Sequence, residues 1–228
     1  PTRQGVFDAV RGVSFDLGQE RLGIVGESGS GKSMTGRAIL RLIRKPGRVE
    51  ADHIKLGGQN LLDLPEKQMR AVRGQQISMV MQDPKFSLNP VMTVGAQLIA
   101  AYQLHGKGGR KAAEARAKAE LRKLKMMSLI ASLEAAPKDD RLVKARGMGL
   151  IFISHDLNLV AELCDRVLIM YAGRIVEVCD ADRLHEAKHP YTRGLLDSLP
   201  RLTEPRQTLS VLNRDPAWAE APSVDGRA

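Results

Sequence analysis

A short glycine-rich loop between an apolar strand and a helix constrains the fold of this chain more than any other feature. The run Leu22–Val25 is apolar and has the length of a strand, and it ends at Gly26. From Ser33 to Arg44 the apolar residues recur at helical spacing, and Pro46 and Gly47 are expected to end that helix. The sequence therefore predicts a buried strand that leads into a loop, and a loop that opens a helix.

The residue types of this loop are those that bind phosphate. Glycines let the backbone turn tightly with its N–H groups facing inward, and the start of the following helix adds unpaired N–H groups and a positive dipole end. Lys32 places an ammonium against the β and γ phosphates, and the Ser33 hydroxyl is placed to ligate Mg²⁺. We therefore expect a nucleoside triphosphate to be bound by Gly26, Glu27, Ser28, Gly29, Ser30, Gly31, Lys32 and Ser33.

The rest of the chain alternates between strand and helix patterns. Ala172 and Gly173 separate two apolar runs and predict a two-residue hairpin turn. From about Thr203 onward the chain has little periodicity and is expected to be flexible. Strands are expected at Val13–Leu17, Ile77–Met81, Leu150–Ser154, Val167–Tyr171 and Arg174–Val178, and helices at Thr93–His105, 110–127 and Asp156–Leu163.

Composition excludes several classes of protein. A chain of 228 residues with 43% hydrophobic and 27% charged residues is typical of a soluble globular protein, and its apolar runs are shorter than the about 20 residues needed to cross a bilayer. Two cysteines, Cys164 and Cys179, build no metal cluster or disulfide framework, which favours a reducing cytoplasm. The net charge of +9 suits a nucleic acid, an anionic membrane surface or an acidic protein.

Two further motifs follow the loop, and their order along the chain indicates a family. Gln82 follows an apolar run and resembles the Q-loop of ABC-transporter ATPases, and His155 follows Leu150–Ser154 and resembles their H-loop. The resemblance implies that Gln82 reaches Mg²⁺ and the attacking water and couples the site to membrane subunits. It implies that His155 contacts the γ-phosphate, and that ATP and Mg²⁺ are the cofactors.

Longer segments are similar to the oligopeptide, dipeptide and nickel importer ATPases within that family: 73–90, 164–177 and His189–Leu196. The resemblance implies an α/β P-loop NTPase (RecA-like) core with an N-terminal antiparallel β subdomain and a helical subdomain that is truncated. We expect an ATPase domain over residues 1–200, with an atypical interior at 119–140, and a flexible C-terminal extension of the peptide-importer type over 201–228.

One short run imitates the family's signature sequence, Leu-Ser-Gly-Gly-Gln. Leu56-Gly57-Gly58-Gln59 lies before Gln82, whereas the signature of the family lies after it. We therefore interpret Ile54–Leu62 as a strand and turn of the antiparallel sheet.

The resemblance is interrupted between Gln82 and His155. This interval is several tens of residues shorter than in the family, and 119–140 contains neither a signature sequence nor a Walker B strand, which is an apolar run ending in Asp-Glu. Two explanations remain open: the sequence in hand omits residues that the protein contains, or the protein carries an internal deletion.

The family resemblance implies an ATP-hydrolysing subunit that powers import of peptides or related small solutes. Its partners would be a second ATPase subunit, identical or paralogous, two membrane permease subunits and, indirectly, an extracytoplasmic solute-binding protein. It would lie peripherally on the cytoplasmic face of the inner membrane. The alternative is a chain that binds nucleotide without hydrolysing it. A nucleic-acid partner is not expected, because aromatic residues for base stacking make up only 4% of the chain.

Overall fold

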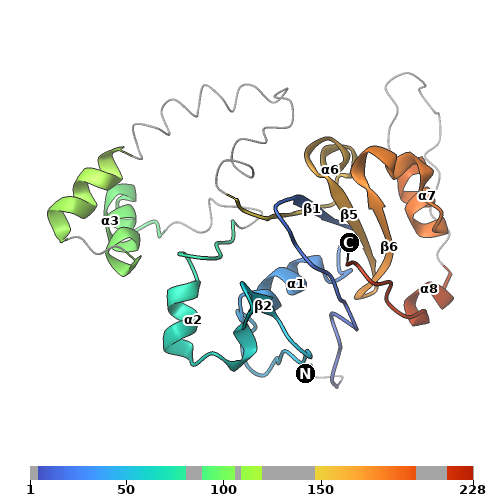
Figure 1. Ribbon diagram of the computed structural model, residues 1–228, viewed down its shortest axis with the longest axis horizontal. Helices are drawn as coiled ribbons and strands as arrows, with labels where there is room; N and C mark the ends of the chain where they lie inside the picture. The colour runs from blue at the N-terminus through green and yellow to red at the C-terminus, as the bar shows by residue number, and fades with distance from the viewer. Residues whose placement is uncertain (1–4, 81–88, 106–108, 120–146, 199–214, 228) are drawn as a thin grey trace. The chain divides into compact units, whose positions relative to one another are not determined.

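The computed structural model describes residues 5–80, 89–105, 109–119, 147–198 and 215–227 of the chain (Figure 1). Their contacts group them into two compact units, which we treat separately. The sheet unit comprises the described residues of Pro1–Ala38, Leu42–Val49 and Pro137–Ala228, and the helical unit those of Ile39–Arg41 and Glu50–Ala136.

The sheet unit is built on a four-stranded sheet of order β4-β1-β5-β6. β1 (Arg21–Val25) pairs in parallel with β4 (Leu150–Ser154) on one side and with β5 (Arg166–Tyr171) on the other. All five residues of β1 are buried, as a parallel strand with neighbours on both sides requires. The strands expected at Leu22–Val25 and Leu150–Ser154 are confirmed.

Two apolar clusters cover the two faces of this sheet. On one face α6 (Leu157–Leu163) packs over Val25, Val167 and Ile169. Asp156 caps this helix, because its Oδ1 accepts hydrogen bonds from the N–H groups of Asn158 and Leu159. The other face buries Leu22, Ile24, Leu168, Met170 and Ile175. Successive residues of β1 therefore contribute to opposite faces.

β5 and β6 (Arg174–Asp180) form the expected antiparallel hairpin. Its turn residues Ala172 and Gly173 have φ values of 46° and 83°. Two consecutive positive φ values are the signature of the type I′ turn, whose twist matches that of the flanking strands. The hairpin prediction is confirmed.

The C-terminal part of the chain packs on the same unit. η3 (Ala181–Glu186) and α7 (Pro190–Asp197) follow β6. α8 (Ala217–Glu220) comes after residues 199–214. Residues 223–226 then hydrogen-bond to β6 and to the N-terminal segment: Val224 N–H donates to Ile175, and Gly226 N–H donates to Ser14. We expected flexibility from 201 onward, whereas residues 215–227 contact the core; 199–214 lie outside the described residues.

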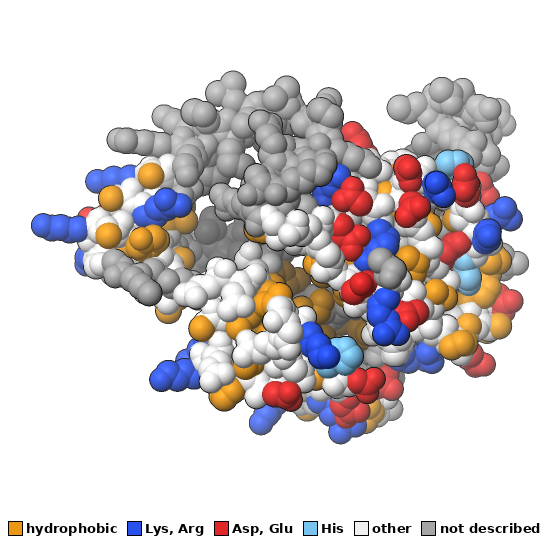
Figure 2. All heavy atoms as spheres, viewed as in Figure 1, with side chains coloured by type: hydrophobic (Ala, Val, Ile, Leu, Met, Phe, Trp, Pro, Cys, Tyr) orange, Lys and Arg blue, Asp and Glu red, His pale blue; other side chains and the backbone are white. Residues whose placement is uncertain are grey.

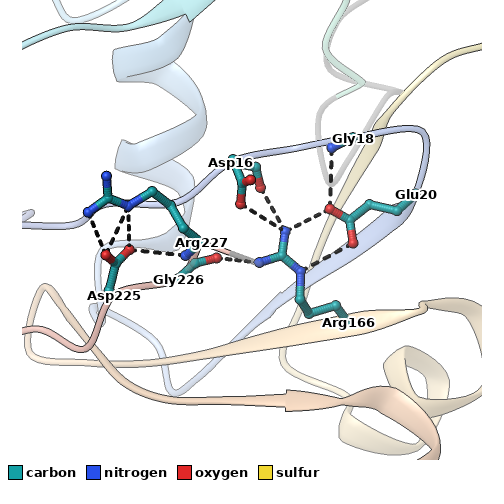
Figure 3. Close-up of polar contacts among 7 residues, drawn as sticks. All are labelled: Asp16, Gly18, Glu20, Arg166, Asp225, Gly226 and Arg227. Atoms are coloured by element: carbon teal, nitrogen blue, oxygen red, sulfur yellow. Dashed lines mark hydrogen bonds and ion pairs between the residues drawn. The ribbon is translucent and has the colours of Figure 1, made fainter.

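Arg166, the first residue of β5, connects this C-terminal segment to the N-terminal one (Figure 3). Its guanidinium donates to both carboxylate oxygens of Glu20, at 2.7 and 3.2 Å, and to the backbone carbonyls of Asp16 and Gly226. The hydrogen bond to Glu20 is the main reason that the pKa of Arg166 is raised. One nearly buried cation therefore joins three segments that are far apart in the sequence.

The helical unit contains a small antiparallel hairpin and several helices. β2 (Lys55–Leu56) and β3 (Gln59–Asn60) pair around Gly57 and Gly58, which confirms the strand and turn expected within Ile54–Leu62. η1 (Leu61–Asp63) and α2 (Glu66–Val72) bury Leu61, Leu64, Met69 and Val72 together. α3 (Val94–His105) begins where a helix was expected, after Thr93, whose hydroxyl accepts a hydrogen bond from Ala96 N–H. Residues 110–119 are also helical.

Three expectations are wrong in the described residues. Val13–Leu17 contains only an isolated bridge at Phe15, and 77–80 contains only one at Ile77; Met81 lies outside the described residues. α1 (Lys32–Ile39) ends five residues before Arg44. Arg41 has a φ of 52°, and the Arg73 guanidinium donates hydrogen bonds to the backbone carbonyls of Leu40 and Arg41. These tertiary contacts therefore end the helix early.

No helix among the described residues combines the length and the hydropathy that a bilayer crossing requires.

Gly23 in β1 allows α6 to approach the sheet, and its replacement tests this packing. A Cβ atom at this position would lie 2.3 Å from Cγ1 of Val160 and 3.2 Å from Sγ of Cys164. We therefore expect Gly23→Ala to lower the free energy of unfolding by about 1–3 kcal/mol, because both neighbours are buried and cannot move away. Urea unfolding followed by circular dichroism measures it.

Two further variants make this test specific. Gly18→Ala is the matched control, because no atom lies within 4 Å of a Cβ atom there. Adding Val160→Ala should reduce the cost of Gly23→Ala, giving a favourable coupling in a double-mutant cycle. Additive costs would contradict a direct clash.

Candidate nucleotide-binding site

The predicted phosphate loop leaves the carboxyl end of β1 and runs into α1. Gly26 and Gly31 have φ values of 150° and 102°, and both lie against backbone. A Cβ atom on Gly26 would lie 2.1 Å from the carbonyl oxygen of Met170, and one on Gly31 would lie 2.6 Å from that of Ala9. Gly29 differs, because no atom lies within 4 Å of its Cβ position. Glycine is therefore required at two positions by packing, and the third lies on the open side of the loop.

Lys32 lies across this loop. Its ammonium donates to the carbonyl oxygens of Gly26 and Glu27, both at 2.7 Å, and to Oγ of Ser30 at 3.3 Å. Burial lowers the pKa of Lys32, and the charge of Glu27 partly opposes that shift. A partly desolvated ammonium gains more from an anion than an exposed one does, so this position favours phosphate.

α1 contributes its N-terminus to the same place. Lys32 and Ser33 form its first turn, where backbone N–H groups have no intrahelical acceptor and no acidic side chain is present. The exposed Ser33 hydroxyl lies at this end of the helix. Thr35, also near the start of α1, is buried. Its N–H and its hydroxyl both donate hydrogen bonds to the Gly31 carbonyl, which connects the start of the helix to the loop.

His155 leaves the sheet at the same edge as the loop. β1 and β4 are parallel with Val25 opposite Ser154, so Gly26 and His155 are the next residues of neighbouring strands. His155 is exposed. In open α/β sheets, ligands bind at this carboxyl edge. The structure thus places the start of the phosphate loop and His155 at the same edge of the sheet. Gln82 lies outside the described residues.

Two hydrogen bonds with the C-terminal half of the chain hold the backbone of the loop. Gly173 N–H donates to the Ser30 carbonyl at 3.0 Å, and Glu27 N–H donates to the Tyr191 hydroxyl at 3.0 Å. Sequence reasoning missed both partners. The hairpin turn and the His189–Leu196 segment were recognised there, but no pattern in the sequence connects them to the loop.

Comparisons with known proteins identify the family of the chain. A family model described as ABC transporter matches residues 10–146, and one described as oligopeptide/dipeptide transporter, C-terminal region, matches 176–225. The chain therefore belongs to the ABC transporter family of ATPases.

Curated relatives place the chain more narrowly. It is 39% identical over 251 residues to a probable peptide ABC transporter ATP-binding protein of Sinorhizobium fredii, with 90% of this chain and 75% of the relative covered. A dipeptide transport ATP-binding protein of Haemophilus influenzae is 38% identical over 252 residues, covering 90% and 76%. An oligopeptide transport ATP-binding protein of Bacillus subtilis is 38% identical over 248 residues, covering 88% and 69%. The chain belongs with the ATP-binding subunits of peptide-type ABC transporters.

Solved structures confirm the fold class. A dimeric ATP-binding cassette in a post-hydrolysis state, bound to ADP and Pi, has a TM-score of 0.57 at 18% identity, covering 79% of this chain and 94% of that one. An ATP-binding subunit of an ABC transporter has a TM-score of 0.54 at 19% identity, covering 78% and 86%.

The curated relatives contain residues that this chain lacks. Each alignment above is longer than the 228-residue chain, so each relative has residues that this chain lacks. In the part of the chain that the structure describes, β4 has only β1 as a neighbour, and Leu150 is 46% exposed.

Replacement of Lys32 tests the loop directly. We expect Lys32→Ala to weaken ATP binding about 10- to 100-fold, because charge-assisted hydrogen bonds to phosphate are lost. Isothermal titration calorimetry measures the dissociation constant. Lys188→Ala is the matched control, since it removes an exposed positive charge from the same unit. An equal loss in both variants would show that net charge, rather than the loop, determines affinity.

Proposed function

We propose that this chain is the ATP-binding and hydrolysing subunit of an importer for peptides or related small solutes. The observation that carries the proposal is a phosphate loop with Lys32 laid across it, in a chain that matches the peptide-transporter family at 176–225. Relatives named for peptide, dipeptide and oligopeptide transport support the solute class.

The residues at the sheet edge have distinct roles in this proposal. Lys32 and the N–H groups of the loop and of α1 bind the phosphates, and His155 approaches the γ-phosphate from the neighbouring strand. Gln82 positions the attacking water, as the family resemblance implies. These contacts bring donors to oxygens that gain charge in phosphoryl transfer.

The residues present fit Mg²⁺ as the second cofactor. Mg²⁺ keeps several waters and uses one or two protein ligands together with substrate phosphates. Ser33, exposed at the start of α1, provides such a ligand, and Gln82 is the second candidate. Among the described residues no group of three or more His, Cys, Asp or Glu side chains is arranged to hold a metal without the nucleotide. Bound Mg²⁺ would neutralise phosphate charge.

The partners follow from the class of transporter. We expect a second ATPase subunit, identical or paralogous, and two membrane permease subunits, with a solute-binding protein acting indirectly. The chain would lie on the cytoplasmic face of the inner membrane. On the face seen in Figure 2, basic and acidic side chains are interspersed over the sheet unit on the right. On this face, the mixture of charges supports protein partners over a nucleic acid, because nucleic-acid binding favours a continuous basic surface.

Phosphate release by the purified chain tests hydrolysis. We expect Mg-ATP turnover that Lys32→Ala abolishes. The comparisons do not favour the alternative of a chain that binds nucleotide without hydrolysing it, but the assay separates the two directly. ATP binding that requires Lys32, without Lys32-dependent phosphate release, would assign the chain to the alternative.

His155 provides a sharper prediction about chemistry. His155→Ala should lower kcat at least about tenfold while the dissociation constant for ATP stays within about twofold, because a γ-phosphate contact acts mainly in the transition state. Asn158→Ala, an exposed change in the adjacent helix, should leave both values unchanged. A loss of binding equal to the loss of kcat would refute this role.

A further inference from the structure

Tyr191 lies beneath the phosphate loop although 164 positions separate it from Glu27 in sequence. Its side chain is fully buried, and its hydroxyl accepts the N–H of Glu27 at 3.0 Å. Glu27 is the second residue of the loop, so this bond fixes the peptide plane at the point where the chain leaves β1. The orientation of that plane affects the N–H groups that follow it, and phosphate binding depends on those groups.

The position of Tyr191 is in turn fixed by other aromatic rings. Its ring centroid lies 4.7 Å from that of Tyr171, at the end of β5, and 6.1 Å from that of Trp218 in α8. Trp218 also meets Tyr171 edge-on at 6.0 Å and His189, the N-cap of α7, at 5.6 Å. These separations are typical of favourable aromatic pairs.

The aromatic cluster therefore connects the C-terminal segment to the loop. Trp218 belongs to the segment 215–227, which is hydrogen-bonded to the sheet through Val224 and Gly226. Tyr191 contacts the loop through its hydroxyl, and Trp218 contacts Tyr191 through its ring. Within the described residues, no hydrogen bond or ring contact joins Trp218 directly to the loop. Removal of Trp218 should consequently act on the loop through Tyr191.

We propose that Tyr191 is a positioning residue of the phosphate loop, and that Trp218 holds it in place, so that the packing of the C-terminal segment sets the affinity for nucleotide. This inference rests on the proposed nucleotide binding at Lys32. It extends that binding to a part of the chain that carries no phosphate ligand.

Tyr191→Phe tests the hydroxyl alone, because the ring and its packing remain. We expect the dissociation constants for Mg-ATP and Mg-ADP to rise about two- to tenfold, the effect of one lost hydrogen bond. Circular dichroism at the assay temperature confirms that the variant is folded. Tyr171→Phe is the matched control: it removes a hydroxyl from the same cluster, and no hydrogen bond of that hydroxyl occurs within the described residues.

Trp218 supplies a spectroscopic readout, since it is the only tryptophan in the chain. Nucleotide binding should change its emission on excitation at a wavelength selective for tryptophan, and Tyr191→Phe should reduce that change at saturating nucleotide. A purely structural role of Tyr191 would not alter the signal of the saturated state. Wild-type affinity in Tyr191→Phe, an equal loss in Tyr171→Phe, or an unchanged emission response would each overturn the role of the hydroxyl.

A double-mutant cycle tests the path from Trp218. Trp218→Leu should weaken nucleotide binding, and Tyr191→Phe with Trp218→Leu should be no weaker than the worse single variant, because both act on one hydrogen bond. Additive losses would overturn the path through Tyr191. Lys32→Ala distinguishes the two hypotheses. If it leaves the affinity unchanged, the proposed nucleotide site is wrong. If it weakens binding while Tyr191→Phe and Trp218→Leu do not, only the role of Tyr191 fails.

Discussion

The backbone of the phosphate loop keeps its shape because segments from the far end of the chain satisfy its polar groups. Gly173 donates to the Ser30 carbonyl, and the Tyr191 hydroxyl accepts from the Glu27 amide. Both partners are held by the sheet and its hairpin. A loop rich in glycine has many alternative conformations, so hydrogen bonds from outside the loop are needed to select the one that points N–H groups toward a ligand.

The same principle extends to the C-terminal segment. Arg166 begins the strand next to β1 and bonds to Glu20, Asp16 and Gly226 (Figure 3). A guanidinium has five donors in a fixed plane, so it can join several segments at once. The described residues after β6 therefore belong to the same unit as the phosphate loop, and the role proposed for Tyr191 would make their packing matter for the site.

β4 lies at an edge of the described sheet. An apolar parallel strand is normally covered on both sides, yet β4 has one neighbour among the described strands. The relatives align over more residues than this chain contains, and the sequence between Gln82 and His155 lacks the motifs of the family. Within the described residues, the outer side of β4 is therefore an open edge of the sheet.

Local chemistry was sufficient to predict the loop, its strand, the 172–173 turn and the ends of β4, because each depends on residues adjacent in sequence. The hydrophobic period and the turn residues also predicted the start of α3 and the extent of α6. Prediction failed where groups distant in sequence decide the local structure. Arg73 donates hydrogen bonds to the Leu40 and Arg41 carbonyls, which would otherwise accept from the continuation of α1. Phe15 pairs with Gly226 only as an isolated bridge.

The sequence by itself therefore predicted the chemistry of the proposed site: glycines that would admit phosphate, Lys32 that would bind it, and a histidine after an apolar strand. Only the tertiary structure decided which groups hold that chemistry in position. Parallel pairing of β1 with β4 brings Gly26 and His155 to one edge, and burial of Tyr191 brings a hydroxyl to the loop. Sequence spacing does not specify such contacts, because they form only when strands and helices distant in the chain pack together.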